Sequence, residues 1–87
     1  MLVGKVIGSI VSTRKNEKLV GSKFMIVESV MNGNHQTLVA VDNVGAGIGE
    51  IVLVATGSAA RIGCNMADSP VDAAIVGIVD DGIGLSL

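Results

Sequence analysis

Residues 39–61 constrain the fold of this chain more than any other stretch. An apolar segment at 39–41 leads through the sequence GAGIG at 45–49 into a second apolar segment at 51–55. Glycine tolerates positive φ and lets backbones come close, so this loop predicts a tight connection between two strands. The residues on both sides of the loop therefore predict a β-rich fold.

One helical turn is predicted directly after these strands, over 57–63. The alanines at 59 and 60 favour helix. Ser58 can cap the free amides at the start of the turn, and Gly63 can take the left-handed position that closes it. We expect this helix to separate the last two strands of the fold.

The period of two that is typical of β-strands recurs along most of the chain. In the first strand, Gly4 and Gly8 predict a bend or a close backbone approach. Asn32-Gly33 predicts a hairpin between the second and third strands. The five predicted strands cover 2–11, 23–30, 38–42, 50–56 and 71–79. They predict one all-β domain over 1–87. A small, partly open barrel with OB-like closure is one solution that leaves few exposed edges, but the strand pattern alone does not choose it over a sandwich.

The composition predicts a homo-oligomer. The chain has 87 residues, Phe24 is its only aromatic residue, and it contains 12 glycines. A domain of this size buries only about 60% of its unfolded surface, and association is a usual remedy for a small core. A mean hydropathy of +0.67 is consistent with apolar surface that a partner covers.

The net charge of −2 is unevenly distributed: residues 1–41 carry +3 and residues 42–87 carry −5. Two interpretations remain open, an ordinary solvated surface and charge complementarity between neighbouring subunits of a head-to-tail ring. Neither half predicts nucleic-acid binding, since no aromatic residues lie among the basic ones.

The longest apolar run, at 51–55, is far shorter than the ~20 residues of a membrane span. The single cysteine, Cys64, excludes an intramolecular disulfide and fits a reducing cytosol.

No catalytic, cofactor or metal site is predicted. The glycine loop reads G-x-G-x-G and precedes a strand, whereas a dinucleotide site needs G-x-G-x-x-G before a helix. Asp42 and Glu50 could form an acid/base pair, but hydrogen bonds to amides of the glycine loop are the favoured role. His35 has no second metal ligand at suitable spacing. Cys64 could be a reactive thiol near Arg61, but a small packed residue or an incidental loop cysteine is the favoured interpretation.

Two motifs carry a resemblance to a known family. They are the pattern Asp-x-x-Gly-Ala-Gly-x-Gly-Glu over 42–50 and the sequence SAAR over 58–61. With the segments 4–8 and 70–80, they make the chain resemble the pentameric vertex proteins of bacterial microcompartments, from about residue 2 to residue 80. The resemblance implies a five-stranded OB-like barrel that assembles into a cyclic pentamer.

By the same resemblance, the protein is a structural shell protein and not an enzyme. Its pentamers would cap the vertices of a polyhedral shell in the cytoplasm, with hexameric shell proteins as neighbours and no cofactor, nucleic acid or membrane as partner. The enclosed pathway, as in a carboxysome or in a catabolic compartment, stays open. The alternative is a small OB-like module that binds a ligand or nucleic acid.

The resemblance also implies which residues lie at or near the subunit interface. They belong to the glycine loop, the helical turn and the last strand. Arg61 could pair with Glu50 or Asp72, because a guanidinium suits a planar, bidentate contact at a subunit boundary. The predicted interface and motif residues are Asp42, Gly45, Ala46, Gly47, Gly49, Glu50, Ser58, Ala59, Ala60, Arg61 and Asp72.

Overall fold

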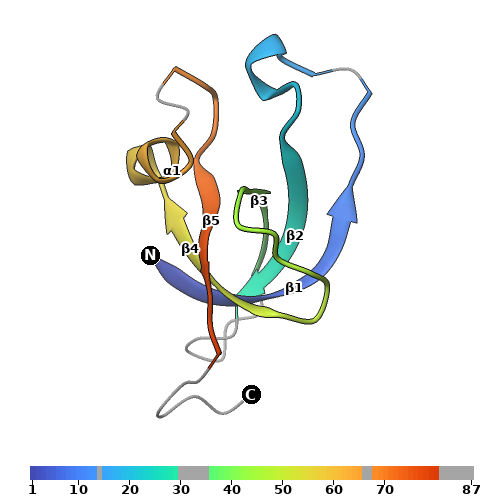
Figure 1. The fold of residues 1–87 in the computed structure, drawn as a ribbon, viewed down its shortest axis with the longest axis vertical. Coiled ribbons are helices and arrows are strands. Elements are labelled where there is room, and N and C mark those ends of the chain that lie inside the picture. Colours follow the sequence, from blue (N-terminus) through green and yellow to red (C-terminus); the bar gives the residue numbers. More distant parts are fainter. Residues whose placement is uncertain (14, 30–35, 66–67, 81–87) are drawn as a thin grey trace.

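A computed structural model describes residues 1–13, 15–29, 36–65 and 68–80 of the chain. Its strands and helices follow the order expected from the sequence, with one additional 3₁₀ turn in the first loop (Figure 1). The elements are β1 (Leu2–Ile10), η1 (Glu17–Leu19), β2 (Lys23–Ser29), β3 (Thr37–Asp42), β4 (Ile51–Thr56), α1 (Ser58–Gly63) and β5 (Ala73–Ile78). The predicted hairpin at Asn32-Gly33, His35 and the tail after Asp80 lie outside the described residues.

The five strands form a closed barrel in the order β1-β2-β3-β5-β4. All neighbours are antiparallel except β3 and β5, which pair in parallel through Val41–Ala74 and Asp42–Ile75. The predicted all-β, OB-like barrel is therefore confirmed, with one correction. The barrel was expected to be partly open, whereas the short parallel ladder between β3 and β5 closes it and removes the exposed strand edges there.

Strand β1 reaches both of its neighbours by bending. Its first residues pair with β4 and its last residues with β2, and the register with β2 shifts between Val6 and Gly8. Gly4 lies where the bent strand comes close to β2: a Cβ atom there would stand 2.4 Å from Val27 Cγ1 and 2.9 Å from the Glu28 carbonyl oxygen. The predicted close approach at Gly4 is confirmed, and the bulge accounts for the bend near Gly8.

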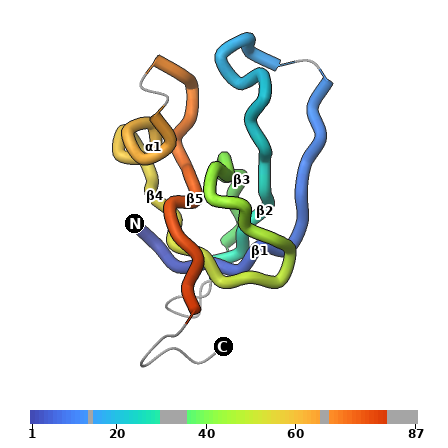
Figure 2. Tube along the Cα trace, in the orientation of Figure 1, coloured from blue at the N-terminus to red at the C-terminus, as the bar shows by residue number. Residues whose placement is uncertain are grey.

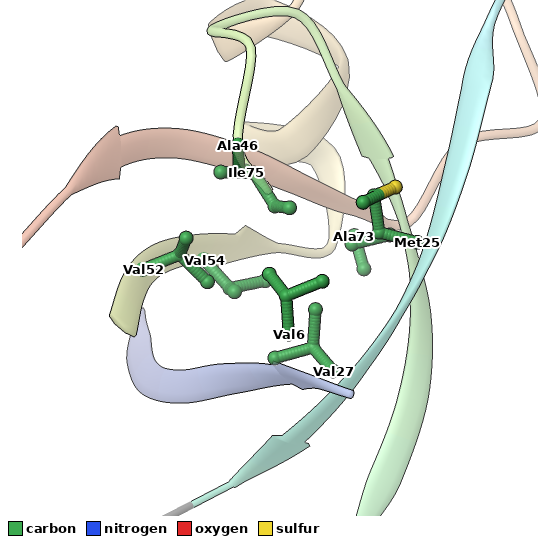
Figure 3. Close-up of a cluster of buried hydrophobic side chains, with 9 residues drawn as sticks. Val6, Met25, Val27, Ala46, Val52, Val54, Ala73 and Ile75 are labelled. Carbon is green, nitrogen blue, oxygen red and sulfur yellow. The ribbon is translucent and has the colours of Figure 1, made fainter. Parts of the chain in front are cut away.

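The barrel interior is filled by small aliphatic side chains. Val6, Val27, Val52, Val54 and Ile75 are fully buried and point toward one another, with Met25 and Ala73 beside them (Figure 3). Ala46 reaches this inner cluster from the connection between β3 and β4. Buried and more exposed positions alternate around Val6 in β1 and around Val27 in β2, whereas three successive residues at the start of β5 are buried.

A second, outer cluster lies between the barrel wall and α1. It consists of buried Val41, Ala55, Ala60, Cys64, Val71 and Ala74. Phe24, half-buried, packs against this outer cluster, not inside the barrel. The only aromatic residue of the chain therefore helps to attach α1 and the segment before β5 to the barrel surface.

Candidate functional site

The connection between β3 and β4 is organised by the carboxylate of Asp42. Asp42 is 5% exposed and ends β3. Its Oδ1 accepts hydrogen bonds from the amides of Val44 at 3.0 Å and Gly45 at 3.2 Å, and its Oδ2 accepts one from the Ala46 amide at 2.9 Å. Bonds from a charged acceptor are stronger than neutral ones. The predicted role of Asp42 as an acceptor for the loop amides is confirmed.

Glu50 stabilises the other end of the same loop. Its Oε1 accepts the Gly47 amide at 2.6 Å, and its own amide donates to the Gly47 carbonyl at 3.1 Å. Two further backbone bonds join the loop to β1: Gly49 N donates to Val6 O at 2.8 Å, and Val6 N donates to Glu50 O at 3.0 Å. In Figure 2 the loop accordingly runs from β3 down to β1 before it enters β4. The loop is therefore fixed at both ends.

The glycines of the loop serve two different purposes. Gly45 and Gly49 have positive φ, at 83° and 95°, which L side chains rarely adopt. Gly47 is not in that region. A Cβ atom at this position would instead meet Glu50 Oε1 at 3.2 Å, so glycine keeps the loop close to the carboxylate. The expectation of positive φ is confirmed at two of the three positions.

Two predictions about the ends of α1 are wrong. The residue before the helix is Gly57, with φ 66°, and no side chain caps the helix, so Ser58 is an exposed first helical residue and not a cap. The left-handed residue after the helix is Asn65, with φ 59°, and not Gly63. Gly63 is needed for packing, since a Cβ atom there would lie 2.8 Å from Val76 Cγ1 on β5.

Arg61 connects α1 to the segment that precedes β5. Its Nη1 donates to the Val71 carbonyl at 3.1 Å, whereas we expected a carboxylate of Glu50 or Asp72 as the partner. Asp72 contributes through its backbone instead: its carbonyl accepts the Gly57 amide at 2.8 Å, and its side chain is exposed. Within one chain, Arg61 therefore binds the Val71 carbonyl in place of the Glu50 or Asp72 carboxylate.

The structure divides the predicted site residues into three groups. Asp42, Ala46 and Ala60 are buried and hold the architecture of one chain. Gly47, Glu50 and Arg61 are half-buried, and the remaining ones, Gly45, Gly49, Ser58, Ala59 and Asp72, are exposed. The loop belongs to the β1 side of the barrel, while α1 packs on β4 and β5, so the two motifs form separate surfaces.

Exposed aliphatic side chains are a feature that motif analysis missed. Ile48 at the tip of the glycine loop is 67% exposed, Ile7 on β1 45%, Val39 on β3 47% and Ile62 on α1 76%. An apolar residue at the outward position of an alternating strand is the sequence signal for Ile7 and Val39. Such residues mark surfaces that bind another protein when several lie close together.

The described residues contain neither a cluster of metal ligands nor an exposed cysteine thiol. Among residues 1–13, 15–29, 36–65 and 68–80, no group of three or more His, Cys, Asp or Glu side chains is placed to hold a metal ion. Cys64 is buried in the outer cluster, with its Sγ 3.8 Å from the Arg61 carbonyl, which favours the packed residue over the incidental loop cysteine. None of the helices in this part of the chain has the length and apolarity of a membrane span.

Comparison with known protein families gives a match over residues 1–80 to the family described as ethanolamine utilisation protein EutN/carboxysome. The bacterial microcompartment shell vertex protein GrpN of Rhodospirillum rubrum is 51% identical over 83 residues, which is 92% of this chain and 93% of GrpN. The vertex protein EutN of Escherichia coli is 42% identical, over 93% of this chain and 88% of EutN. The carboxysome shell vertex protein CcmL of Gloeobacter violaceus is 41% identical, over 92% and 83%.

Solved structures agree with these sequence relatives. The structure described as the GrpN pentameric microcompartment shell protein from Rhodospirillum rubrum superposes with a TM-score of 0.87 at 48% identity, covering 98% of this chain and all of that one. An ethanolamine utilization protein EutN superposes with a TM-score of 0.89 at 41% identity, covering 97% and 91%. The similarity in sequence and in structure extends over the whole barrel.

Proposed function

The chain belongs to the EutN/CcmL family of bacterial microcompartment shell vertex proteins, and from this premise we propose that it forms a homopentamer that caps the vertices of a polyhedral protein shell. The observation that carries the proposal is the superposition on a pentameric shell protein at 48% identity and a TM-score of 0.87. Microcompartments lie in the cytoplasm, and that is where the protein acts.

The hydrogen bonds made by the two carboxylates of the motif over 42–50 fit a structural role. Both oxygens of the Asp42 carboxylate accept backbone amides, and Glu50 accepts another, so these side chains support a loop. We therefore propose that the protein catalyses no reaction and binds no cofactor. Its partners in this proposal are further copies of itself and the hexameric tiles of the same shell, not nucleic acid or a membrane.

Native mass spectrometry across a concentration series tests the assembly directly. We expect a dominant species of about 44 kDa, five times the 8.8 kDa chain, because a closed cyclic ring buries the same interface in every subunit. The species should persist at micromolar concentration. A folded monomer or dimer throughout the series would contradict the proposal and favour a small OB-like binding module.

Arg61→Ala and Gly47→Val are expected to weaken the pentamer more than they change the strand content. Arg61 holds the segment before β5, and a valine at 47 would displace the Glu50 carboxylate that supports the glycine loop. A hydrogen bond from a charged group contributes roughly 1.5–3 kcal/mol, so we expect about ten-fold or more dissociation at a fixed concentration.

Sedimentation measures the dissociation of these variants, and far-UV circular dichroism measures their strand content. Lys18→Ala is the matched control, because Lys18 also donates from its side chain to a backbone carbonyl, that of Asp68, but is exposed. This control should leave the ring intact. Intact rings at micromolar concentration in both Arg61→Ala and Gly47→Val would remove these residues from the interface.

A further inference from the structure

A pocket lies between the end of β1 and the start of β2, where the long loop that contains η1 joins the two strands (Figure 1). This β1–β2 pocket is lined by residues 9–12, 15 and 22–25, and its volume is about 290 Å³. Sites for small-molecule ligands usually have roughly 300–1,000 Å³. The pocket lies at the lower limit of that range, so its size suits a ligand of only a few non-hydrogen atoms.

The floor of the pocket is apolar. Ile10, Val11, Phe24 and Met25 contribute to it. Met25 is 5% exposed and belongs to the inner cluster of the barrel, whereas Phe24 packs against the outer cluster. Both clusters therefore support the floor, and an aliphatic group bound there would contact side chains that are already packed.

Two lysine side chains line the pocket from its two sides. Lys15 belongs to the loop after β1, and Lys23 is the first residue of β2. The Lys15 Nζ donates to the carbonyl of Ser12, and an ammonium group has two further N–H donors. None of the described residues that line the pocket is a carboxylate. The pocket is therefore positively charged in a chain whose net charge is −2.

Asp42 lies opposite Lys23 in the ladder between β2 and β3, but its carboxylate is engaged elsewhere. Its Oδ1 accepts the amides of Val44 and Gly45, and its Oδ2 accepts that of Ala46. These bonds turn the carboxylate toward the glycine loop. The Lys23 side chain is exposed and can reach an anion in the pocket.

We propose that the β1–β2 pocket binds a small aliphatic carboxylate, with the carboxylate group between Lys15 and Lys23 and the hydrocarbon part against Phe24 and Met25. Ligand sites combine a mainly apolar lining with a few polar groups that fix the orientation, as here. Phosphate would use the lysines but leave the apolar floor in water, and a neutral amide would use the floor without the charges. All lining residues belong to one chain, so the site does not depend on the proposed pentamer.

Methyl NMR of the full chain tests the site. The chain has four methionines, and of these Met25 lines the pocket, so its isotope-labelled methyl group is a local probe. Its signal is assigned by its loss in Met25→Leu, a substitution of similar volume that cores tolerate. Titration with sodium butyrate at constant ionic strength should move this signal along a saturating curve with a midpoint in the millimolar range. Butyramide, which has the same shape without the charge, should bind several-fold more weakly.

Substitution of the two lysines tests the charge contribution. Lys15→Gln and Lys23→Gln should each weaken butyrate binding by about two- to five-fold, since attraction between exposed charges is modest, and the double variant by about ten-fold. Lys5→Gln is the matched control. Lys5 is exposed and its loss changes the net charge equally, but it does not line the pocket, so the midpoint should stay unchanged.

Three results would overturn the proposed site. They are a Met25 signal that does not saturate with butyrate, equal binding of butyramide, and a loss of affinity in Lys5→Gln as large as in Lys23→Gln. Tighter binding of inorganic phosphate than of butyrate would also contradict the assigned ligand class, because the apolar floor would then contribute nothing. Native mass spectrometry decides the vertex function separately, so a pentamer without butyrate binding would refute this inference alone.

Discussion

Replacing Asp42 with alanine is expected to lower the free energy of unfolding by about 3–5 kcal/mol, since hydrogen bonds to a charged group contribute roughly 1.5–3 kcal/mol each. The carboxylate is 5% exposed and accepts the amides of Val44, Gly45 and Ala46. Alanine would leave these donors without their acceptor at the point where the glycine loop leaves β3. Because small domains are stable by only about 5–15 kcal/mol, the loss would be a large fraction of the total.

Denaturant titrations at one fixed protein concentration measure this loss, because the apparent stability of an oligomer depends on its concentration. Asp42→Asn keeps one acceptor oxygen in place and should fall between the wild type and Asp42→Ala. Asp68→Ala is the control. Its side chain is exposed, and its backbone carbonyl, which the substitution keeps, accepts the hydrogen bond from Lys18, so it should change stability by less than about 0.5 kcal/mol. Equal stability of Asp42→Ala and the wild type would show that the loop does not depend on this carboxylate.

Gly4→Ala is the second substitution with a large expected effect. The added Cβ atom would lie 2.4 Å from Val27 Cγ1 and 2.9 Å from the Glu28 carbonyl oxygen, inside the contact between β1 and β2. The carbonyl belongs to the strand ladder and cannot move aside as a flexible side chain could. Overpacking of a core costs typically 1–3 kcal/mol, and the stability lost should lie at the upper end of that range.

Gly8→Ala tests whether this effect comes from space and not from the loss of a glycine. Gly8 lies on the same strand, and its added Cβ atom would find Ile26 Cδ1 at 3.5 Å, an ordinary contact. Replacing a glycine that needs no special backbone conformation usually stabilises by about 0.4–1 kcal/mol. Thermal unfolding of both variants should therefore move in opposite directions. A drop of the same size in both would mean that the bend of β1 itself requires glycine.

The strands could be predicted from local pattern. The period of two predicted which residues of β1 and β2 share a face, and the structure shows that the face with Val6 and the face with Val27 point into the barrel. The glycine loop was also predictable, because only glycine accepts the φ values found at Gly45 and Gly49. Local pattern was less successful at the ends of α1. There Gly57 precedes the helix without a side-chain cap, where Ser58 was expected to provide one, and Asn65 takes the left-handed conformation expected of Gly63.

The partner of Arg61 could not be predicted, since its hydrogen bond to the Val71 carbonyl depends on how α1 packs against the segment before β5. The same is true of the role of Gly63, which only the proximity of Val76 explains. Carboxylates are common partners of arginine, but a backbone carbonyl that lies close can also accept a hydrogen bond from the guanidinium.

The sequence by itself determined the strand order along the chain, the glycine loop with its carboxylate and the family, because these depend on residue type and short-range spacing. Only the tertiary structure decided that β3 and β5 close the barrel and that Phe24 packs outside it. The physical reason is that these features depend on contacts between residues far apart in the chain, whose relative positions are set when the strands bend and pair.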